Sequence, residues 1–283
     1  MFKLKLHERS PRVTLLQILL RDEYRLKIDG SFGPKTMAAV RKFQAATREF
    51  SPTPLPTPTT WKNLLKGTNL TVVSSIDAGD KDLAKDDSAT LEAWGDKPIL
   101  LGAMCNGLGQ LISEVKSRSQ GLSLAALRLD GHGNFGRWMT LSVGEVADLS
   151  KENPKEYRLI EKEYYSYINP THFAKVAPIL GQLTSKFAPF GFMEHHGCSL
   201  GKKPATVKMM GKLANLLGVP ISVGVTMQSF GVVADFEGPV VTVFPHGLSL
   251  RTWSHKFQTV PVRTMSLATS AFETMETAGF RVR

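Results

Sequence analysis

The sequence predicts an α+α/β protein, in which a small three-helix module precedes a three-layer α/β/α sandwich with a mainly parallel sheet. Residues 1–67 show helical apolar spacing and hold 13 Lys or Arg against 5 Asp or Glu, whereas the other 216 residues hold 22 against 20. From Lys97 onward, short apolar runs alternate with helical segments, which is typical of parallel βαβ units. Hydrophobic residues make up 42% of the chain and charged residues 21%, as in globular proteins.

The amino-terminal module is expected to contain three helices. The apolar run at 13–20 predicts an amphipathic helix whose leucines face inward. The Asp-Gly pair at 29–30 predicts a tight turn, and Pro34 predicts the start of a second helix. The Pro- and Thr-rich stretch at 51–60 is typical of a loop, and Trp61 then lies in a short closing helix.

Residues 68–96 carry many acidic side chains and little apolar periodicity. This composition predicts an acidic linker that tethers the module (1–67) to an α/β domain (97–283). Within that domain we expect strands at 98–104, 124–133, 190–198, 219–225 and 239–247. We expect helices at 108–119, 172–189, 204–218 and 266–279. Ligands of open α/β sheets collect at the carboxyl ends of the strands, where the sequences GHG and HHGC lie.

The module resembles the first type of peptidoglycan-binding domain, a three-helix unit common on bacterial wall hydrolases. The residues that carry the resemblance lie in LQILLRDEYRLKIDGSFGPKTMAAVRKFQ and in the later WKNL. The resemblance departs at SPTPLPTPT, where the family usually repeats an Asp-Gly turn. It implies peptidoglycan as a partner and a binding role for Asp29, Phe32, Arg41, Gln44 and Trp61.

The positive charge of the module favours an anionic partner such as a wall polymer, although a merely solvated basic surface is the alternative. Few aromatic residues interleave with the basic ones and no nucleic-acid motif is visible, so nucleic acid is not an expected partner.

LAALRLDGHGNFG and FGFMEHHGCSLG resemble the caspase-like, or haemoglobinase, fold of cysteine hydrolases. In that fold one strand ends in His-Gly and a later parallel strand ends in the nucleophilic Cys; a bacterial domain of unknown function has a similar layout. The resemblance implies Cys198 as the nucleophile, His132 as its base, and the backbone N–H groups of Gly133 and Cys198 as oxyanion donors. Asp130 either orients His132 or binds substrate. Further candidates for substrate contacts are Glu194, His195, His196 and His246.

The chemistry of a thiol supports this pairing. A free cysteine has a pKa near 8.5, so it needs an imidazole or a helix N-terminus beside it to be a thiolate at neutral pH. Cys198 has His132 as one candidate and the helix expected from about Pro204 as the other. Cys105 and Cys198 are too few for a disulfide framework, so we expect free thiols.

Three other functions remain open at this point. The L,D-transpeptidase family shares the sequence His196-Gly197-Cys198, but this chain lacks the Ser/Thr before it and the Arg/Asn after it that the family carries, and the domain of that family is mostly β. A metallohydrolase would use the set Asp130, His132, Glu194, His196 and Cys198, although no recognised zinc spacing is present. The last is a non-catalytic adaptor whose function lies in the module. No metal or cofactor is expected.

The sequence therefore predicts a bacterial cell-wall-targeted Cys-His hydrolase that cleaves an amide bond in a peptidoglycan stem or a protein. No small-residue cleavage site follows the basic and apolar start, and no apolar run is long enough to span a bilayer. We expect synthesis in the cytoplasm without a signal peptide and action at the wall, in the periplasm or after secretion, as an effector or a lysin. A secretion-apparatus component or an immunity protein would then be a further partner.

Overall fold

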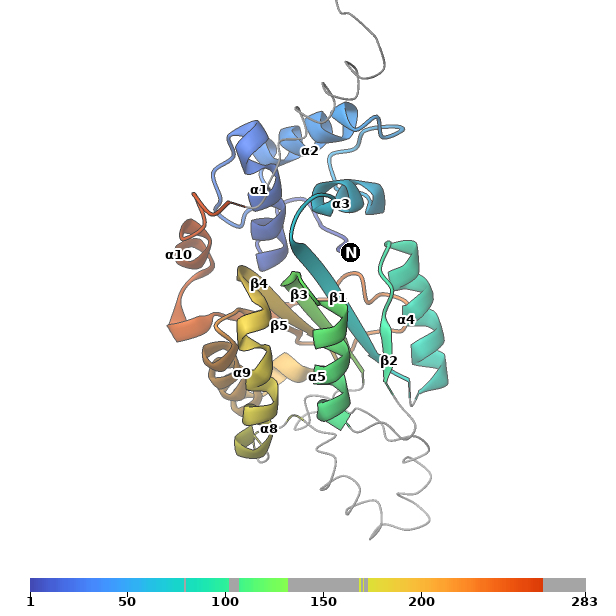
Figure 1. Cartoon of the computed structure of the whole chain (residues 1–283), viewed down its shortest axis with the longest axis vertical. Helices are drawn as coiled ribbons and strands as arrows, with labels where there is room; N and C mark the ends of the chain where they lie inside the picture. Colours follow the sequence, from blue (N-terminus) through green and yellow to red (C-terminus); the bar gives the residue numbers. More distant parts are fainter. Residues whose placement is uncertain (79, 102–106, 132–167, 169, 171–172, 262–283) are drawn as a thin grey trace, which may run out of the picture.

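The computed structural model describes residues 1–78, 80–101, 107–131, 168, 170 and 173–261. A three-helix module lies against a sandwich built on one central sheet (Figure 1). The helices of the module are α1 (Pro11–Tyr24), α2 (Pro34–Ala46) and α3 (Pro58–Leu65). Each begins at a proline, whose missing N–H would have no partner in the first helical turn. The three helices expected from the sequence are thus present.

The sheet has six strands in the order β2-β1-β3-β4-β5-β6. The first five are parallel and β6 is antiparallel. The strands are β1 (Leu70–Asp77), β2 (Ile99–Leu101), β3 (Ser123–Asp130), β4 (Phe187–His196), β5 (Ile221–Gly224) and β6 (Val240–Val243). The remaining helices are α4 (Lys81–Ala93), α5 (Gly107–Arg118), α8 (Phe173–Leu180), α9 (Pro204–Leu217) and α10 (Leu250–His255). The 3-10 turns are Gly181–Lys186, Leu200–Lys202 and Pro245–Gly247. This arrangement confirms the predicted fold class.

Residues 68–96 are not the linker that their composition suggested. They form β1, which lies between β2 and β3 in the sheet, and helix α4. Asp80 caps α4 by accepting the backbone N–H groups of Asp82 and Leu83. Leu83 and Leu91, eight residues apart, face inward, and most of the acidic side chains of α4 are exposed. The acidic side chains of the segment belong to the solvated face of α4. Because β1 begins only a few residues after α3, no flexible linker separates the module from the sheet.

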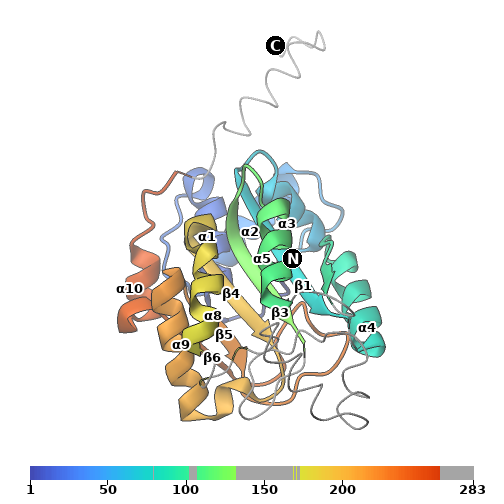
Figure 2. The ribbon, with the colours of Figure 1, turned by 60° about the horizontal axis from the view of Figure 1, so that its bottom comes forward.

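Alternation along β4 sends its side chains to two different cores. Met193 packs with α5, α8 and α9 on one face of the sheet, whereas Phe190 and Phe192 pack with the module on the other. Figure 2 shows α5, α8 and α9 in front of the sheet, with α1, α2 and α3 behind it. The module therefore supplies much of the second helical layer of the predicted sandwich.

This position explains why α1 is not the amphipathic helix that was expected. Every residue from Pro11 to Arg21 is buried, because α1 lies between the other module helices, α10 and the sheet. Its polar side chains have long-range partners: Thr14 Oγ1 lies 2.7 Å from Ser254 Oγ, and Arg21 Nη1 donates to the Phe257 carbonyl at 2.8 Å. Within the described residues, no helix is both long and apolar enough to span a membrane.

Candidate functional site

The carboxyl ends of β3 and β4 lie side by side, with Asp130 in register with His196. They form a small pocket with Gly131, Cys198 and the loop that follows β5; Leu83 and Asp87 of α4 also line it. Its free volume is about 20 Å³, which is room for roughly one water molecule. Two sequence motifs that are more than sixty residues apart are thus brought to one place.

Cys198 is a free, partly exposed thiol at the turn after β4. Its Sγ accepts the backbone N–H of Gln228 at 3.4 Å and lies 3.6 Å from the Gln228 carbonyl oxygen. Gly197 is required before it, because a Cβ there would lie 2.7 Å from Cε1 of His195 and 2.9 Å from Cδ1 of Leu200. The chain therefore holds the thiol in the lining of the pocket. The helix expected beyond it, α9, begins only after an intervening 3-10 turn.

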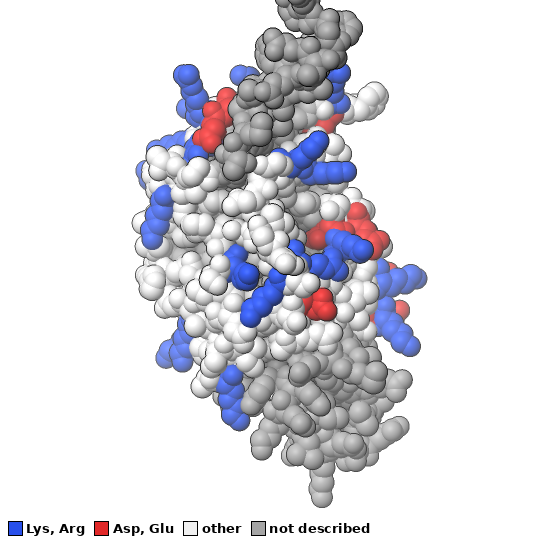
Figure 3. All heavy atoms as spheres, in the orientation of Figure 1, with Lys and Arg blue, Asp and Glu red and all other residues white. Residues whose placement is uncertain are grey.

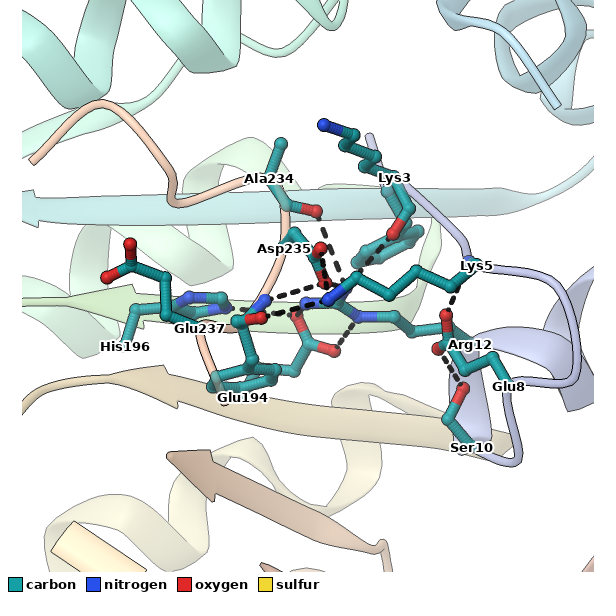
Figure 4. Close-up of polar contacts among 12 residues, drawn as sticks. Lys3, Lys5, Glu8, Ser10, Arg12, Glu194, His196, Ala234, Asp235 and Glu237 are labelled. Carbon is teal, nitrogen blue, oxygen red and sulfur yellow. Dashed lines mark hydrogen bonds and ion pairs between the residues drawn. The ribbon is translucent and has the colours of Figure 1, made fainter. Parts of the chain in front are cut away.

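A buried network of charges lies beside His196, centred on Glu194 (Figure 4). Arg12 of α1 binds both carboxylate oxygens, with Nε on Oε1 and Nη2 on Oε2 at 2.9 Å. Nε of Arg128 lies 3.6 Å from Oε2, and Nε2 of His196 lies 3.4 Å from the same oxygen. Burial acts to raise the pKa of Glu194, but the two guanidiniums and the hydrogen bond from His196 outweigh it and hold this pKa well below its usual range. Glu194 is therefore ionised.

The two adjacent histidines lie on opposite faces of β4. His196 is on the face of Glu194 and lines the pocket, and burial lowers its pKa to about 4 although Glu194 acts to raise it. His195 is fully buried on the other face, and burial together with the neighbouring His196 lowers its pKa to about 3. Both imidazoles are neutral at pH 7. Of the two, only His196 can contact a molecule in this pocket.

His246 lies away from the site. It is exposed beyond the end of β6, where its N–H donates to Oδ1 of Asn215 at 2.6 Å. Because β6 runs antiparallel, its last residue, Val243, pairs with Ile221 at the start of β5. His246 therefore lies near the amino-terminal ends of the parallel strands, whereas Cys198 lies at their carboxyl ends. The expectation that His246 lines the same crevice does not hold in this structure.

Asp130 shares the pocket with a second acid, Asp87 of α4. Burial raises the pKa of Asp130 well above its usual value, and the charge and hydrogen bond of Asp87 raise it further. Burial also raises the pKa of Asp87, although the N–H of Gly231 donates to its Oδ1 at 2.6 Å. The nearby carboxyl group of Asp87 therefore favours the protonated state of Asp130. Sequence reasoning missed Asp87, because the acid lies in the segment taken for a linker; its only signal is its position between the inward Leu83 and Leu91.

Some of the expected site residues lie outside the described part of the chain. These are His132 and Gly133, together with Cys105 and the helix expected at 266–279. Among the residues that the structure describes, no group of three or more His, Cys, Asp or Glu side chains is arranged to hold a metal ion.

The five residues expected to bind peptidoglycan occupy different environments. Phe32, Gln44 and Trp61 are buried, and Trp61 Nε1 donates to the Phe2 carbonyl at 2.8 Å. Asp29 is partly exposed and stabilises the turn by accepting the N–H of Ser31 at 2.9 Å. Arg41 is exposed on α2. The buried three therefore maintain the fold of the module.

A groove of about 340 Å³ lies on the surface of the module, between the end of α1 and helix α2. Its lining includes Tyr24, Arg25, Lys35 and Lys42, with Glu23 as the acidic member. Sequence reasoning missed these residues, because their helical spacing resembles that of any solvated face. Cations beside an aromatic ring suit a sugar polymer that carries carboxylates.

Comparison with known proteins identifies the module and leaves the sheet region unmatched. No curated protein and no solved structure matches the chain. Residues 9–64 match the family model described as "Putative peptidoglycan binding domain". The match spans α1, α2 and nearly all of α3. The amino-terminal module is thus similar to peptidoglycan-binding domains, which supports peptidoglycan as a partner and targeting of the chain to the cell wall.

Proposed function

We propose that the chain is a cell-wall-targeted cysteine hydrolase, which its module holds on peptidoglycan and which cleaves an amide bond at Cys198. The meeting of the β3 and β4 ends carries the proposal, because it puts Asp130-Gly131 and His196-Gly197-Cys198 in one pocket. His132 follows Gly131 directly in the sequence. Adjacent parallel strands that end in His-Gly and in Cys are what the caspase-like resemblance implies. A mostly parallel sheet also favours it over an L,D-transpeptidase, whose domain is mostly β.

The proposed reaction proceeds through a thioester. His132 takes the proton of the Cys198 thiol, and the sulfur attacks the carbonyl carbon of the amide. The C–N bond breaks and the leaving amine takes the proton from His132. Water, deprotonated by the same imidazole, then attacks the thioester carbon, which releases a carboxylic acid and restores the thiol. The N–H groups of Gly133 and Cys198 stabilise the oxyanion in both steps.

The basic groove of the module is the proposed contact with the wall. On the face seen in Figure 3, Lys and Arg side chains project around the upper part of the molecule, where Figure 1 places α1 and α2. Lys35 and Lys42 are exposed at this groove. Their charges favour the carboxylates of the stem peptides, so the wall's own amide bonds are the substrate that binding brings closest.

Digestion of purified peptidoglycan by the wild type and by Cys198→Ala tests this function, with the products identified by mass spectrometry. New muropeptides that are absent with the variant are expected, and their masses identify the bond. Sedimentation of both proteins with the insoluble wall tests binding separately. Binding without cleavage by the wild type would overturn the hydrolase.

That outcome would favour a non-catalytic adaptor, the second candidate function. The observation in its favour is that the pocket is small and that the Cys198 thiol already has Gln228 as a backbone partner. In an adaptor the thiol is a packed side chain, and Cys198→Ala binds the wall like the wild type while neither protein cleaves it.

A further inference from the structure

Arg12 reaches from the peptidoglycan-binding module to Glu194, whose neighbour His196 lines the Cys198 pocket. It lies in the first turn of α1 and is 3% exposed. Two of its nitrogens bind Glu194, and its Nη1 lies 3.4 Å from the carbonyl oxygens of Lys3 and Ala234. The same Nη1 lies 3.6 Å from Oδ1 of Asp235 (Figure 4). Such a fully engaged guanidinium has one orientation, which fixes the carboxylate in front of it.

His196 is held by two groups, and Arg12 contacts both. Glu194 engages Nε2 of the imidazole at 3.4 Å. The ring of Phe236 stacks on the imidazole, with centroids 4.0 Å apart and planes 6° apart. Cζ of Arg12 in turn lies 5.0 Å from the Phe236 centroid, as a cation–π contact. The loss of this guanidinium would free the carboxylate and the aromatic ring together.

The partner at Nε2 also decides the tautomer of His196. An ionised carboxylate has only acceptors, so the proton of the neutral ring must be on Nε2. Nδ1 is then left with its lone pair, on a side chain that lines the same pocket as Cys198. A pocket with a fixed acceptor nitrogen can orient a substrate N–H or a water molecule.

We propose that Arg12 is a positioning residue, through which the peptidoglycan-binding module fixes the orientation and tautomer of His196 beside Cys198. The catalytic meaning of this inference rests on the proposed function, but the state of His196 does not. On this view the module is part of the site as well as an anchor.

The charges around His196 predict how its pKa responds. Burial and the charges of Arg128 and Arg12 lower this pKa, whereas Glu194 raises it. The titratable and charged groups near the imidazole, on all elements that form the network and the pocket, are Arg12, Asp87, Arg128, Asp130, Glu194, His195, Cys198 and Asp235. Removal of the Arg12 charge must raise the pKa of His196, and removal of the Glu194 charge must lower it.

Histidine NMR titration of the full chain tests the inference, with the resonance assigned through His196→Gln. The wild type is expected to titrate near pH 4. Arg12→Met should move this midpoint up by about one pH unit or more, the usual effect of one close charge. Arg12→Lys keeps the charge and should return the midpoint most of the way.

Arg21→Met is the matched control, because Arg21 is another buried arginine of α1 that joins the module to the rest of the chain, through Phe257 and Val260. It should leave His196 unchanged. An unmoved midpoint in Arg12→Met, or an equal shift in Arg21→Met, would overturn the inference.

If Arg12→Met does not fold, the His196 titration midpoints of Glu194→Gln and Arg12→Lys test the inference in its place. Glu194→Gln should lower the midpoint, whereas general loosening of the site would raise it by admitting water. Arg12→Lys should stay within a few tenths of a pH unit of the wild type; a rise in both variants contradicts the inference. In peptidoglycan digestion, Arg12→Met should lower kcat by about tenfold or more with little change in KM. No cleavage by the wild type would refute the proposed function and leave the titration result valid.

Discussion

Phe2 joins the module to the sheet, and its removal tests whether the two share one core. Its ring is fully buried, with the centroid 5.5 Å from that of Trp61 in α3 and 5.4 Å from that of Phe192 in β4. The guanidinium carbons of Arg12 and Arg128 lie 5.4 Å and 4.9 Å from the same centroid. Phe2→Ala therefore removes a buried apolar ring together with the two cation–π contacts that Arg12 and Arg128 make with it.

The expected loss follows from these contacts. Truncation of a buried phenylalanine costs about 3–5 kcal/mol, and each desolvated cation–π contact accounts for roughly 1–2 kcal/mol of such a loss. We expect Phe2→Ala to lower the free energy of unfolding by about 4 kcal/mol. In a chain of 283 residues this corresponds to a fall in Tm on the order of 10 °C.

Urea unfolding, followed by tryptophan fluorescence, measures this loss. The midpoint should fall while the slope with denaturant stays the same, because the surface exposed on unfolding is unchanged. Phe50→Ala is the control, since Phe50 is 99% exposed and should not alter the midpoint. A loss below about 1 kcal/mol in Phe2→Ala would refute the shared core, because a fully buried ring cannot be removed so cheaply.

Three further predictions follow from the site and the module. The free energy of unfolding should fall between pH 6.5 and pH 4, because the lowered pKa values of His195 and His196 let the unfolded chain bind those protons first. In a pH series of urea titrations, His196→Gln should remove the share of His196, up to about 3 kcal/mol, and leave that of His195. Gly197→Ala should destabilise the chain by about 2 kcal/mol through its clash with the His195 ring, whereas Gly211→Ala in α9, with ordinary contacts, should stabilise it by about 0.5–1 kcal/mol in the same assay. Lys35→Glu should weaken sedimentation with peptidoglycan and Lys208→Glu, exposed on α9, should not; equal losses would argue against the groove.

Local signals were sufficient for most of the fold. The start of α2 was readable from Pro34, because the proline ring lacks the N–H that a first turn cannot use. Pro58, which begins α3, was instead taken as part of a loop. Gly218 ends α9 in the left-handed conformation, which glycine adopts readily at the end of a helix. The strands 221–224 and 240–243 were visible as short apolar runs between turn residues. All these features depend on neighbours within a few positions.

The segment 68–96 shows what local signals miss. Ser74 and Ser75 give β1 a polar character, yet both are buried, and Ser74 Oγ donates to Oδ2 of Asp96 at 2.5 Å. Arg128 Nη1 lies 3.8 Å from the same carboxylate oxygen, fifty positions away from β1 in sequence. The polar residues of such a strand resemble those of a loop in the local sequence, because their partners lie far away along the chain.

The candidate site was predictable in position but not in composition. The motif HHGC correctly marked a strand end, because its glycine and the run before it are local features. Alternation along β4 puts His195 and His196 on opposite faces, although both were expected to contact substrate. Three features depended on packing between elements: the antiparallel direction of β6, the approach of Asp87 from α4, and the arrival of Arg12 from the module. The sequence of residues 190–198 alone cannot predict any of these three features, because each depends on a segment elsewhere in the chain.

The shared core changes how wall binding can act on the site. A flexible tether raises the local concentration of substrate and permits many orientations of the tethered domain. Here α1 packs on the sheet through Phe190 and Phe192, and its Arg12 binds Glu194, whose neighbour His196 lines the Cys198 pocket. The groove at Lys35 and the thiol at Cys198 therefore lie on two parts of the chain that share a core, in which α1 packs against β4. Under the proposed function, a strand of peptidoglycan bound in the groove would present to Cys198 only those bonds that lie at one offset along the polymer. Binding would then select which bond is cut as well as how often it is met.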